Sequence, residues 1–383
     1  MTEIEPSQSK SALDPTPQQR PQLHLAYLDG IRGMAALFVV IHHAFMEIDL
    51  TALPRLLQRP LFWLAYGQVA VDVFIVLSGY CLMLPVVRSG GVLKGGTQRF
   101  FLRRCKRILP PYYVALALFL ILIALVPGMN QKTGVRWDVA LPAFTPGALI
   151  SHLFLVHNLK TNWLHAIDPP MWSIATEFQI YLIFPFILIP LWKRCGNLVT
   201  ILASCGGGLM LSHFIPLFAG ACFWLTGLFA MGMAAASLNF TPNRKKPLAP
   251  EPLLAISIII FITCGLILRK HLPGLVIELI IGIATAALLV GCTEWIKQKK
   301  DRKNPIINLL ESKIAVALGS FSYSLYLIHF PILSLLHLWL RPYALPESTV
   351  FAILALFGTA LSVGISYLFY LLVERHFIPS RSS

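Results

Sequence analysis

The sequence predicts an all-α integral membrane protein with about ten transmembrane helices and with its N- and C-termini in the cytosol. Composition gives the first reason, because 56% of the 383 residues are hydrophobic and only 13% are charged. Ordinary soluble domains carry about a quarter charged residues, and a soluble protein this apolar would expose large patches that drive aggregation. We therefore expect a multi-pass protein of the cytoplasmic membrane whose main contact is the lipid bilayer.

The second reason is a series of ten apolar runs, each long enough to cross a membrane. A hydrocarbon core of about 30 Å requires about 20 mostly apolar residues in a helix. A shorter apolar stretch at 145–159 contains His152 and His157, and we expect it to be interfacial or re-entrant. The ten expected spans lie near 31–50, 66–87, 110–128, 171–191, 197–214, 216–238, 252–270, 273–293, 314–338 and 349–373.

The third reason is the distribution of lysine and arginine. With the N-terminus inside, the inner segments contain 22 of the 31 basic residues and the outer segments contain 8, while Arg32 lies at the inner end of the first span. An excess of Lys and Arg marks cytosolic loops. We therefore assign the net charge of +14 to topology and anionic ligands, and we expect no nucleic-acid partner.

The domain organisation follows from the same runs. We expect one multi-pass membrane domain at 27–378, because no polar stretch between the spans is long enough to bury its own core. Residues 1–26 are polar and rich in Pro and Gln, which predicts a disordered cytosolic tail, and 379–383 form a short cytosolic tail. The seven cysteines lack a CxxC pair and any metal-type spacing with histidine, so we expect no bound metal.

Several titratable side chains fall inside the expected spans. Such residues are costly in lipid, and each is therefore a candidate for a functional role. A single buried histidine can equally be a packing residue. The candidates are Arg32, His42, His43, Asp72, Glu177, Glu278 and His329.

The first span places Arg32 and His43 on one helix face. The two residues are eleven positions apart, which is within about 20° of three full turns and a rise of about 16 Å. Arg32 should then lie at the cytosolic boundary and His43 beyond the middle of the membrane. His42, about 100° away, is expected to point elsewhere.

Depth selects Glu177 as the expected partner of His43. The span with Glu177 enters from outside, which puts the carboxylate about 10 Å below the outer surface, close to the level of His43 about 18 Å from the inner side. A carboxylate at that level would hold the imidazole tautomer and stabilise its charged form, as a general base requires. Comparable or slightly shallower depths are expected for Asp72, Ser78, Tyr326 and His329.

A basic pair opens the third span. Arg104 and Arg107 are three residues apart and face one side of a helix. Arginines in this position suit bidentate binding of phosphate. The alternative interpretation is that the cluster sets topology and contacts anionic lipid. Lys297 to Lys303 is more simply a solvated topology loop.

Together these segments resemble the membrane acyltransferase family 3, whose members O-acylate cell-surface glycans and related acceptors. The resemblance covers about residues 25–380, and its specificity comes from the order of the motifs. These motifs are Tyr27 to Gly33 followed by His43 in an Arg-x10-His pattern, Val71 to Tyr80, Arg104-x-x-Arg107 with Pro110, Trp172-Ser173-Ile174-x-x-Glu177 continuing to Tyr181 and Pro185, and Phe321 to Pro331 with the closing Val373-Glu374-Arg375.

The resemblance implies transfer of an acyl group, most often acetyl, from cytosolic acyl-CoA to a hydroxyl of a sugar, polysaccharide or small acceptor. No permanently bound cofactor is expected, and no metal is needed because a thioester is already activated. We assign His43 as the general base and Glu177 as the residue that orients it. Arg32, Arg104 and Arg107 would hold the nucleotide phosphates of the donor. The expected substrate-binding residues are Asp72, Ser78, Trp172, Tyr326 and His329.

Two substitutions and one missing segment depart from the family pattern. Phe178 stands where many members have a second Glu, so any role of that acid is absent, and Tyr80 replaces a common Phe. No esterase-like periplasmic domain follows the tenth span. This leaves room for a separate periplasmic partner in the transfer to an external glycan.

The sequence is also compatible with other functional classes of membrane protein. Buried His, Glu and Asp could form the proton relay of a secondary transporter, although the sequence lacks repeated halves and matched Gly/Pro-broken spans. A structural or assembly membrane protein would instead tolerate loss of His43 and Glu177. The chemistry of a membrane-bound O-acyltransferase is also compatible, but the context of the Arg-x10-His pattern fits family 3 better.

Overall fold

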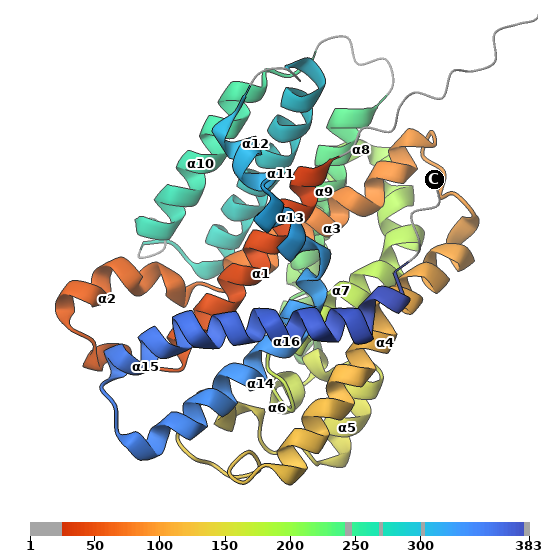
Figure 1. Cartoon of the computed structure of the whole chain (residues 1–383). Helices are drawn as coiled ribbons and strands as arrows, with labels where there is room; N and C mark the ends of the chain where they lie inside the picture. The colour runs from red at the N-terminus through yellow and green to blue at the C-terminus, as the bar shows by residue number, and fades with distance from the viewer. Residues whose placement is uncertain (1–24, 242–246, 268–270, 300–302, 379–383) are drawn as a thin grey trace, which may run out of the picture.

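The computed structural model describes residues 25–241, 247–267, 271–299 and 303–378. Of the tail expected at 1–26, residues 1–24 lie outside this range, whereas Ala26 already begins the first helix, and the tail expected at 379–383 lies outside as well. Within the described part every regular element is helical, so the all-α prediction is confirmed (Figure 1). The α-helices are α1 (Ala26–Met46), α2 (Arg55–Leu61), α3 (Gln68–Arg88), α4 (Gly96–Leu125), α5 (Pro146–Leu153), α6 (Thr161–Leu164), α7 (Met171–Ile183), α8 (Ile189–Phe214), α9 (Leu225–Phe240), α10 (Pro250–Leu266), α11 (Gly274–Gln298), α12 (Pro305–Leu310), α13 (Lys313–Ser320), α14 (Ser322–Leu340), α15 (Glu347–Ile353) and α16 (Thr359–Leu372).

Short 3₁₀ and π segments join these helices. The π segments η5 and η9 keep α7 continuous with α8 and α15 continuous with α16. The connecting elements are η1 (Leu50–Ala52), η2 (Phe62–Ala65), η3 (Arg136–Ala140), η4 (His157–Leu159), η5 (Phe184–Leu188), η6 (Pro216–Ala221), η8 (Arg341–Tyr343), η9 (Leu354–Gly358) and η10 (Glu374–His376).

Seven helical stretches are long and apolar enough to cross a membrane in the described part of the chain. One of them, Met171–Phe214, is 44 residues long and contains Gly196 in a non-helical conformation with φ 77°. This break lies between the two spans expected at 171–191 and 197–214. The shorter apolar helices α9 and α10 occupy the expected sixth and seventh spans. The structure thus supports a multi-pass membrane protein, while the number ten and the orientation stay predictions.

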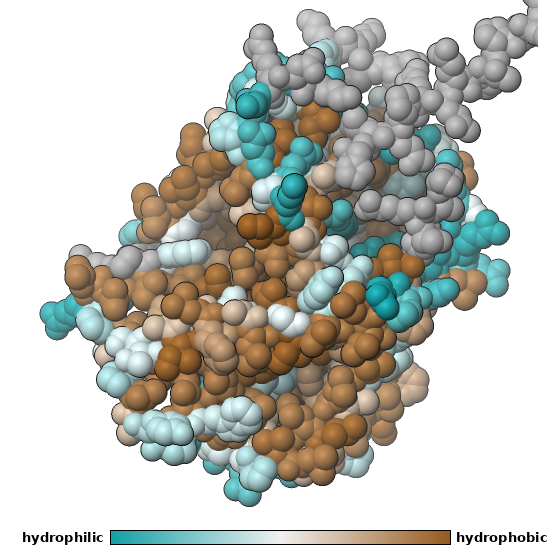
Figure 2. Space-filling model, viewed as in Figure 1, coloured by the Kyte–Doolittle hydropathy of each residue, from teal (hydrophilic) through white to brown (hydrophobic). Residues whose placement is uncertain are grey.

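The surface carries the apolar belt that lipid contact requires. Figure 2 shows hydrophobic side chains over most of the visible face, with hydrophilic side chains gathered toward its upper and right-hand margins. Leu198, Leu202 and Met210 on α8 and Leu356 and Leu372 on the last long helix are all exposed. In water such a surface would aggregate, whereas in a bilayer it is the solvated face.

Helix α1 lies near the middle of the molecule, where it packs against α3, α13 and α14 (Figure 1). Its contact with α13 is close because both helices present glycine. A Cβ on Gly33 would overlap the carbonyl oxygen of Ala315, and one on Gly319 would overlap that of Asp29. On the same side of α1, a Cβ on Gly30 would overlap the carbonyl oxygen of Leu310 at the end of α12. Small residues let helices in a membrane approach closely, since packing is the main attraction between them there. The glycines that flank Arg32 therefore hold α1 in place.

A second close crossing joins α3 to α9. A Cβ on Gly79 would overlap the carbonyl oxygen of Phe229, and a Cβ on Gly232 would overlap that of Val76. The two helices thus pack backbone to backbone. This crossing fixes α3, which supplies Ser78 and Cys81 to the cavity described below.

We expect Gly79→Ala to destabilise the protein, because the added methyl group has no space between α3 and α9. Overpacking of this kind costs about 1–3 kcal/mol. The midpoint of thermal unfolding in detergent, followed by fluorescence-detected size-exclusion chromatography, should fall by several degrees. The matched control is Gly207→Ala in α8, where a Cβ meets open space. An unchanged midpoint for Gly79→Ala would contradict the crossing.

The predicted orientation can be measured at two exposed lysines. Lys94 precedes α4 and Lys132 follows it, and both side chains are exposed. In intact cells a membrane-impermeant maleimide should label Lys132→Cys, whereas Lys94→Cys should react only after permeabilisation. The parent protein, with its own cysteines, gives the background. Labelling of Lys94→Cys in intact cells would reverse the assignment of inside and outside.

Candidate active site

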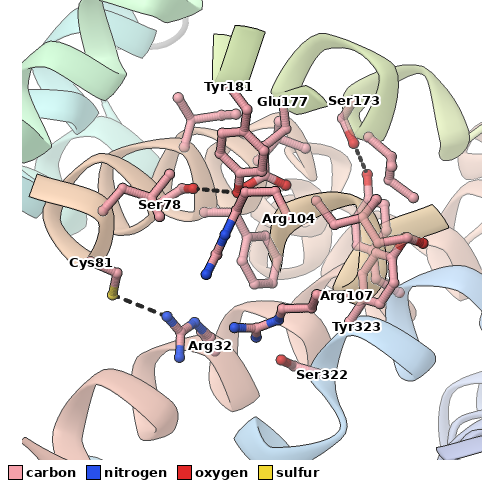
Figure 3. Close-up of a pocket in the computed structure, with 17 residues that line it drawn as sticks. Arg32, Ser78, Cys81, Arg104, Arg107, Ser173, Glu177, Tyr181, Ser322 and Tyr323 are labelled. Atoms are coloured by element: carbon pink, nitrogen blue, oxygen red, sulfur yellow. Dashed lines mark hydrogen bonds between the residues drawn. The ribbon is translucent and has the colours of Figure 1, made fainter. Parts of the chain in front are cut away.

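Three of the predicted arginines line one cavity of about 280 Å³, which we call the basic cavity (Figure 3). Arg32 comes from α1, and Arg104 and Arg107 come from successive turns of α4. The predicted phosphate-binding set is therefore brought together from two helices that are far apart in the sequence. The other walls come from α3, α7 and α14 and include Ser78, Cys81, Ser173, Glu177, Tyr181, Tyr323 and Tyr326.

The arginines of the basic cavity differ in their partners. Arg32 forms an ion pair with Asp29, with 2.8 Å between Nη1 and Oδ1, and its Nη2 donates to the Cys81 Sγ at 3.0 Å. The buried Nε of Arg104 has no hydrogen-bond partner among the described residues. A buried guanidinium donor without a partner is costly. An anionic ligand is the natural acceptor for it.

Glu177 belongs to this cavity as well. Its carboxylate accepts a short hydrogen bond from the Tyr181 hydroxyl, one helical turn further on. The Ser78 Oγ lies 2.7 Å from the same hydroxyl and, since that proton is donated to Glu177, must be the donor. Tyr181 was not predicted as a site residue. Its spacing of four residues from Glu177 nevertheless indicates that the two side chains share one helix face.

A second, smaller cavity of about 140 Å³ contains His43, and we call it the histidine cavity. His43 lies eleven residues beyond Arg32 on α1, so the two cavities lie toward opposite ends of that helix. Val71 and Tyr326 line both cavities and form the shared wall. Other residues that line the histidine cavity are His42, Gln68, Arg136, His165, Trp172 and Phe330.

The ring of His43 is held by His329. The distance from the His43 Nδ1 to the His329 Nε2 is 2.9 Å, and the same Nδ1 lies 3.1 Å from the Val39 carbonyl oxygen. The His329 Nδ1 lies 3.0 and 2.9 Å from the carbonyl oxygens of Leu325 and Tyr326.

These contacts assign the tautomers of both rings. Carbonyl oxygens only accept, so the His329 Nδ1 carries a proton, and in the neutral ring its Nε2 is an acceptor. The His43 Nδ1 must then be the donor to His329. Its Nε2 is left with a lone pair, which is the state that a general base needs.

The predicted pairing of His43 with Glu177 is wrong in this structure. The partner of His43 is His329 on α14, while Glu177 bonds to Tyr181 and lines the basic cavity. The prediction rested on rise along the helix axis, which does not determine which helices are neighbours. Helix α1 packs on α14, and no comparable contact joins it to α7 among the described residues.

His42 also departs from expectation, because it lines the histidine cavity together with His43. Its ring packs edge-on against His43 and is fixed by the preceding loop, where the Gly67 backbone N–H lies 3.1 Å from its Nδ1. A Cβ on Gly67 would overlap the ring. His42 therefore anchors the start of α3 as well as lining the cavity.

The five predicted substrate residues do not share one cavity. Trp172 lines the histidine cavity, Ser78 lines the basic cavity, and Tyr326 lines both. His329 is fully buried behind His43. Asp72 is buried and is not among the described residues that line either cavity, and its Oδ1 lies 3.4 Å from the Gln68 Nε2.

The Tyr326 hydroxyl is locked in the shared wall. It donates to the Pro170 carbonyl oxygen at 3.2 Å and lies 2.6 Å from the Ser173 Oγ. This fastens the ring of α14 to the start of α7. Ser173 is a contact that sequence reasoning missed, although it stands inside the Trp172 motif. Arg136 and His165 were also missed, because a loop residue has no periodic pattern that could indicate a site.

Comparison with known proteins agrees with this geometry. The acyltransferase domain family (Acyl_transf_3) matches residues 25–371. The chain belongs to this family, which defines it as a multi-pass membrane acyltransferase domain.

Several named proteins are similar to this chain over much of its length. The chain is 24% identical over 345 residues to the peptidoglycan O-acetyltransferase OatA of Listeria monocytogenes, which is 80% of this chain and 49% of that protein. It is 25% identical over 346 residues to the putative peptidoglycan O-acetyltransferase YrhL of Bacillus subtilis, covering 80% and 48%. Nodulation protein 10 of Rhizobium leguminosarum is 26% identical over 228 residues, covering 55% and 59%. The chain thus spans about half the length of the first two relatives. No solved structure matches it.

Proposed function

We propose that this chain is a membrane O-acyltransferase that moves an acyl group, most often acetyl, from cytosolic acyl-CoA to a hydroxyl group of a glycan. The observation that carries the proposal is the pair of cavities that share the wall of Val71 and Tyr326. One cavity is rich in arginine and the other holds an imidazole with a free lone pair. Relatives named as peptidoglycan O-acetyltransferases support a glycan acceptor, of which peptidoglycan is one example.

The basic cavity would bind the donor. Arg104 and Arg107 suit the phosphate groups of CoA, because guanidinium groups bind phosphate through paired, charge-assisted hydrogen bonds. Arg32 would add a third positive charge, moderated by its ion pair with Asp29. The lining of the same cavity also includes Phe74, Ile75 and Ile174, apolar side chains suited to the pantetheine arm and the thioester. The predicted inward-facing N-terminus puts this cavity on the cytosolic side.

Glu177 has a different role from the one that its depth suggested. Its carboxylate orders Tyr181 and, through that hydroxyl, Ser78. It also offsets part of the positive charge of the arginines in the same cavity. We therefore assign Glu177 to the organisation of the donor site.

The chemistry would take place at the shared wall. The His43 Nε2 takes the proton from the acceptor hydroxyl as its oxygen attacks the thioester carbonyl carbon. The new C–O bond forms, the C–S bond breaks, and the proton on His43 passes to the departing CoA sulfur. During the step the Nδ1–H donates to His329, whose lone pair stabilises the imidazolium. Phe330 packs edge-on against the His43 ring and limits the access of water.

The donor assignment is tested at Arg107. We expect Arg107→Gln to raise the KM for acetyl-CoA about 10- to 100-fold, because a hydrogen bond to a charged group is worth about 1.5–3 kcal/mol. The kcat should change less, and Arg104→Gln should behave similarly. The matched control is Arg103→Gln on the same helix, since Arg103 contacts the Lys94 carbonyl oxygen and is not among the described residues that line the cavity. An unchanged donor KM in both test variants would assign the pair to topology or lipid contact.

The base assignment is tested at His43 and His329. His43→Ala should lower kcat about 10²–10⁴-fold while acetyl-CoA still binds, because a positioned general base contributes that factor. His329→Phe should cause a smaller loss, and His329→Gln should recover part of it, since an amide oxygen can accept from the His43 Nδ1. Turnover of radiolabelled acetyl-CoA and calorimetric donor binding, on purified protein in detergent, give the two readouts.

The control for this series is His213→Ala, which removes an exposed imidazole at the end of α8. It should leave kcat unchanged. Substantial transfer by His43→Ala would exclude it as the base. Equal losses in His329→Phe and His329→Gln would mean that the second histidine acts through packing alone.

A further inference from the structure

Arg136 occupies a distinctive place at the histidine cavity. It is the first residue of η3, and its backbone N–H donates to the Glu47 carboxylate at 3.3 Å. Its side chain is exposed and lines the cavity with His43 and His165. Within the described ranges the guanidinium has neither an ion pair nor a hydrogen bond. A free arginine is thus presented where an acceptor would enter.

The nearby carboxylates of Asp138 and Glu47 bind groups other than the Arg136 guanidinium. The Asp138 carboxylate accepts from the backbone N–H groups of Thr133 and Gly134 at 2.9 and 2.8 Å. The Glu47 carboxylate is buried and accepts from Ser334 at 2.6 Å, and the His337 ring nitrogen lies 2.8 Å from it. These contacts use the carboxylates to hold loops and helix ends together. They leave the charge of Arg136 without an ionic partner.

The wall of the histidine cavity is correspondingly one-sided in charge. Among the described residues that line it there are one arginine and three histidines, and neither aspartate nor glutamate. The charge of Arg136 acts on both His43 and His165. Partial removal from water lowers the pKa of His165, and Arg136 lowers it further, while a hydrogen bond to the Pro169 backbone opposes both effects. An anion bound beside Arg136 would offset the positive charge that disfavours protonation of these rings.

The basic cavity provides the contrast, because there Glu177 lies among the arginines. The histidine cavity also contains Trp172, whose flat ring suits the face of a sugar, and Gln68, whose amide suits hydroxyl groups. Trp172 and Gln68 suit a saccharide, and Arg136 suits a negatively charged group on that saccharide.

We propose that the histidine cavity selects an anionic acceptor: a sugar that carries a carboxylate or a phosphate ester close to the hydroxyl to be acylated, recognised by Arg136. The inference rests on the proposed function, in which this cavity holds the acceptor. Arg136 binds the anion as a bidentate donor and so sets the position of the sugar relative to the His43 Nε2.

Binding to matched saccharides tests the proposal without requiring turnover. The full chain is placed in nanodiscs of phosphatidylcholine. Dissociation constants are measured for the methyl glycosides of glucuronic acid and glucose, and for glucose 6-phosphate. The parent protein should bind at least one anionic member about tenfold or more tightly than the neutral glycoside, as expected for a charge-assisted hydrogen bond. Arg136→Gln should remove this preference, and Arg136→Lys should keep part of it.

The control is Arg341→Gln, because Arg341 lies beside Gly134 near the same mouth but is not among the described residues that line the cavity. It should keep the preference. Equal affinity for charged and neutral glycosides in the parent protein, absence of binding by all three, or a preference that survives in Arg136→Gln would each overturn the proposal. If nanodiscs with phosphatidylglycerol abolish the preference, the anion recognised is a lipid headgroup, and the glycan assignment fails.

Acetyl-CoA binding, measured in the same samples, separates this proposal from the one on which it rests. Arg136→Gln should leave the donor dissociation constant unchanged, because Arg136 lies outside the basic cavity. A parent protein that binds the anionic saccharide but not acetyl-CoA would refute the donor assignment alone. A parent protein that binds acetyl-CoA without any preference among the saccharides would refute the anionic acceptor alone.

Discussion

The hydrogen bond between His43 and His329 is the interaction on which the site depends. Two backbone carbonyl groups fix the proton on the His329 Nδ1, and this in turn makes His43 the donor in the 2.9 Å contact between the rings. The free lone pair of His43 is therefore a consequence of the helical backbone of α14. No carboxylate is required to hold the imidazole in this tautomer, and the pair stays uncharged until a proton arrives. In a low-dielectric interior, that arrangement avoids burying a permanent ion.

This contact requires α1 and α14 to stay in register, which the packing of α1 provides. Gly33 and Gly319 let the backbones of α1 and α13 touch, Gly30 does the same between α1 and the end of α12, and α13 leads directly into α14. The position of His329 relative to His43 is thus set by close helix packing about three to four helical turns away. The same register places Tyr326 at the wall between the cavities, where Ser173 and the Pro170 carbonyl hold its hydroxyl. The base, its orienting partner and the partition between the cavities all follow from one helix–helix contact.

Periodicity along one helix was enough to predict part of this site. The three-residue spacing predicts Arg104 beside Arg107, and both line the basic cavity, while Arg32 and His43, eleven residues apart on α1, line the two adjoining cavities. These predictions succeeded because rise and rotation are fixed by the helix itself. The arrangement of helices around α1 depends on side-chain packing and on glycines from distant segments, which spacing does not encode. Glu177 was therefore paired with the wrong neighbour.

The loop residues show the same limit in another form. Arg136 is not among the site residues that the sequence predicts, because the first residue of a 3₁₀ turn has no periodic partner that could mark it. In the structure its charge faces His43, so the imidazolium that forms during acyl transfer would arise beside a guanidinium. That repulsion opposes catalysis when the cavity holds a neutral molecule, and it is relieved when an anionic group binds Arg136. The acceptor itself would then complete the electrostatic environment of the base, which couples recognition of the correct substrate to the step that activates its hydroxyl group.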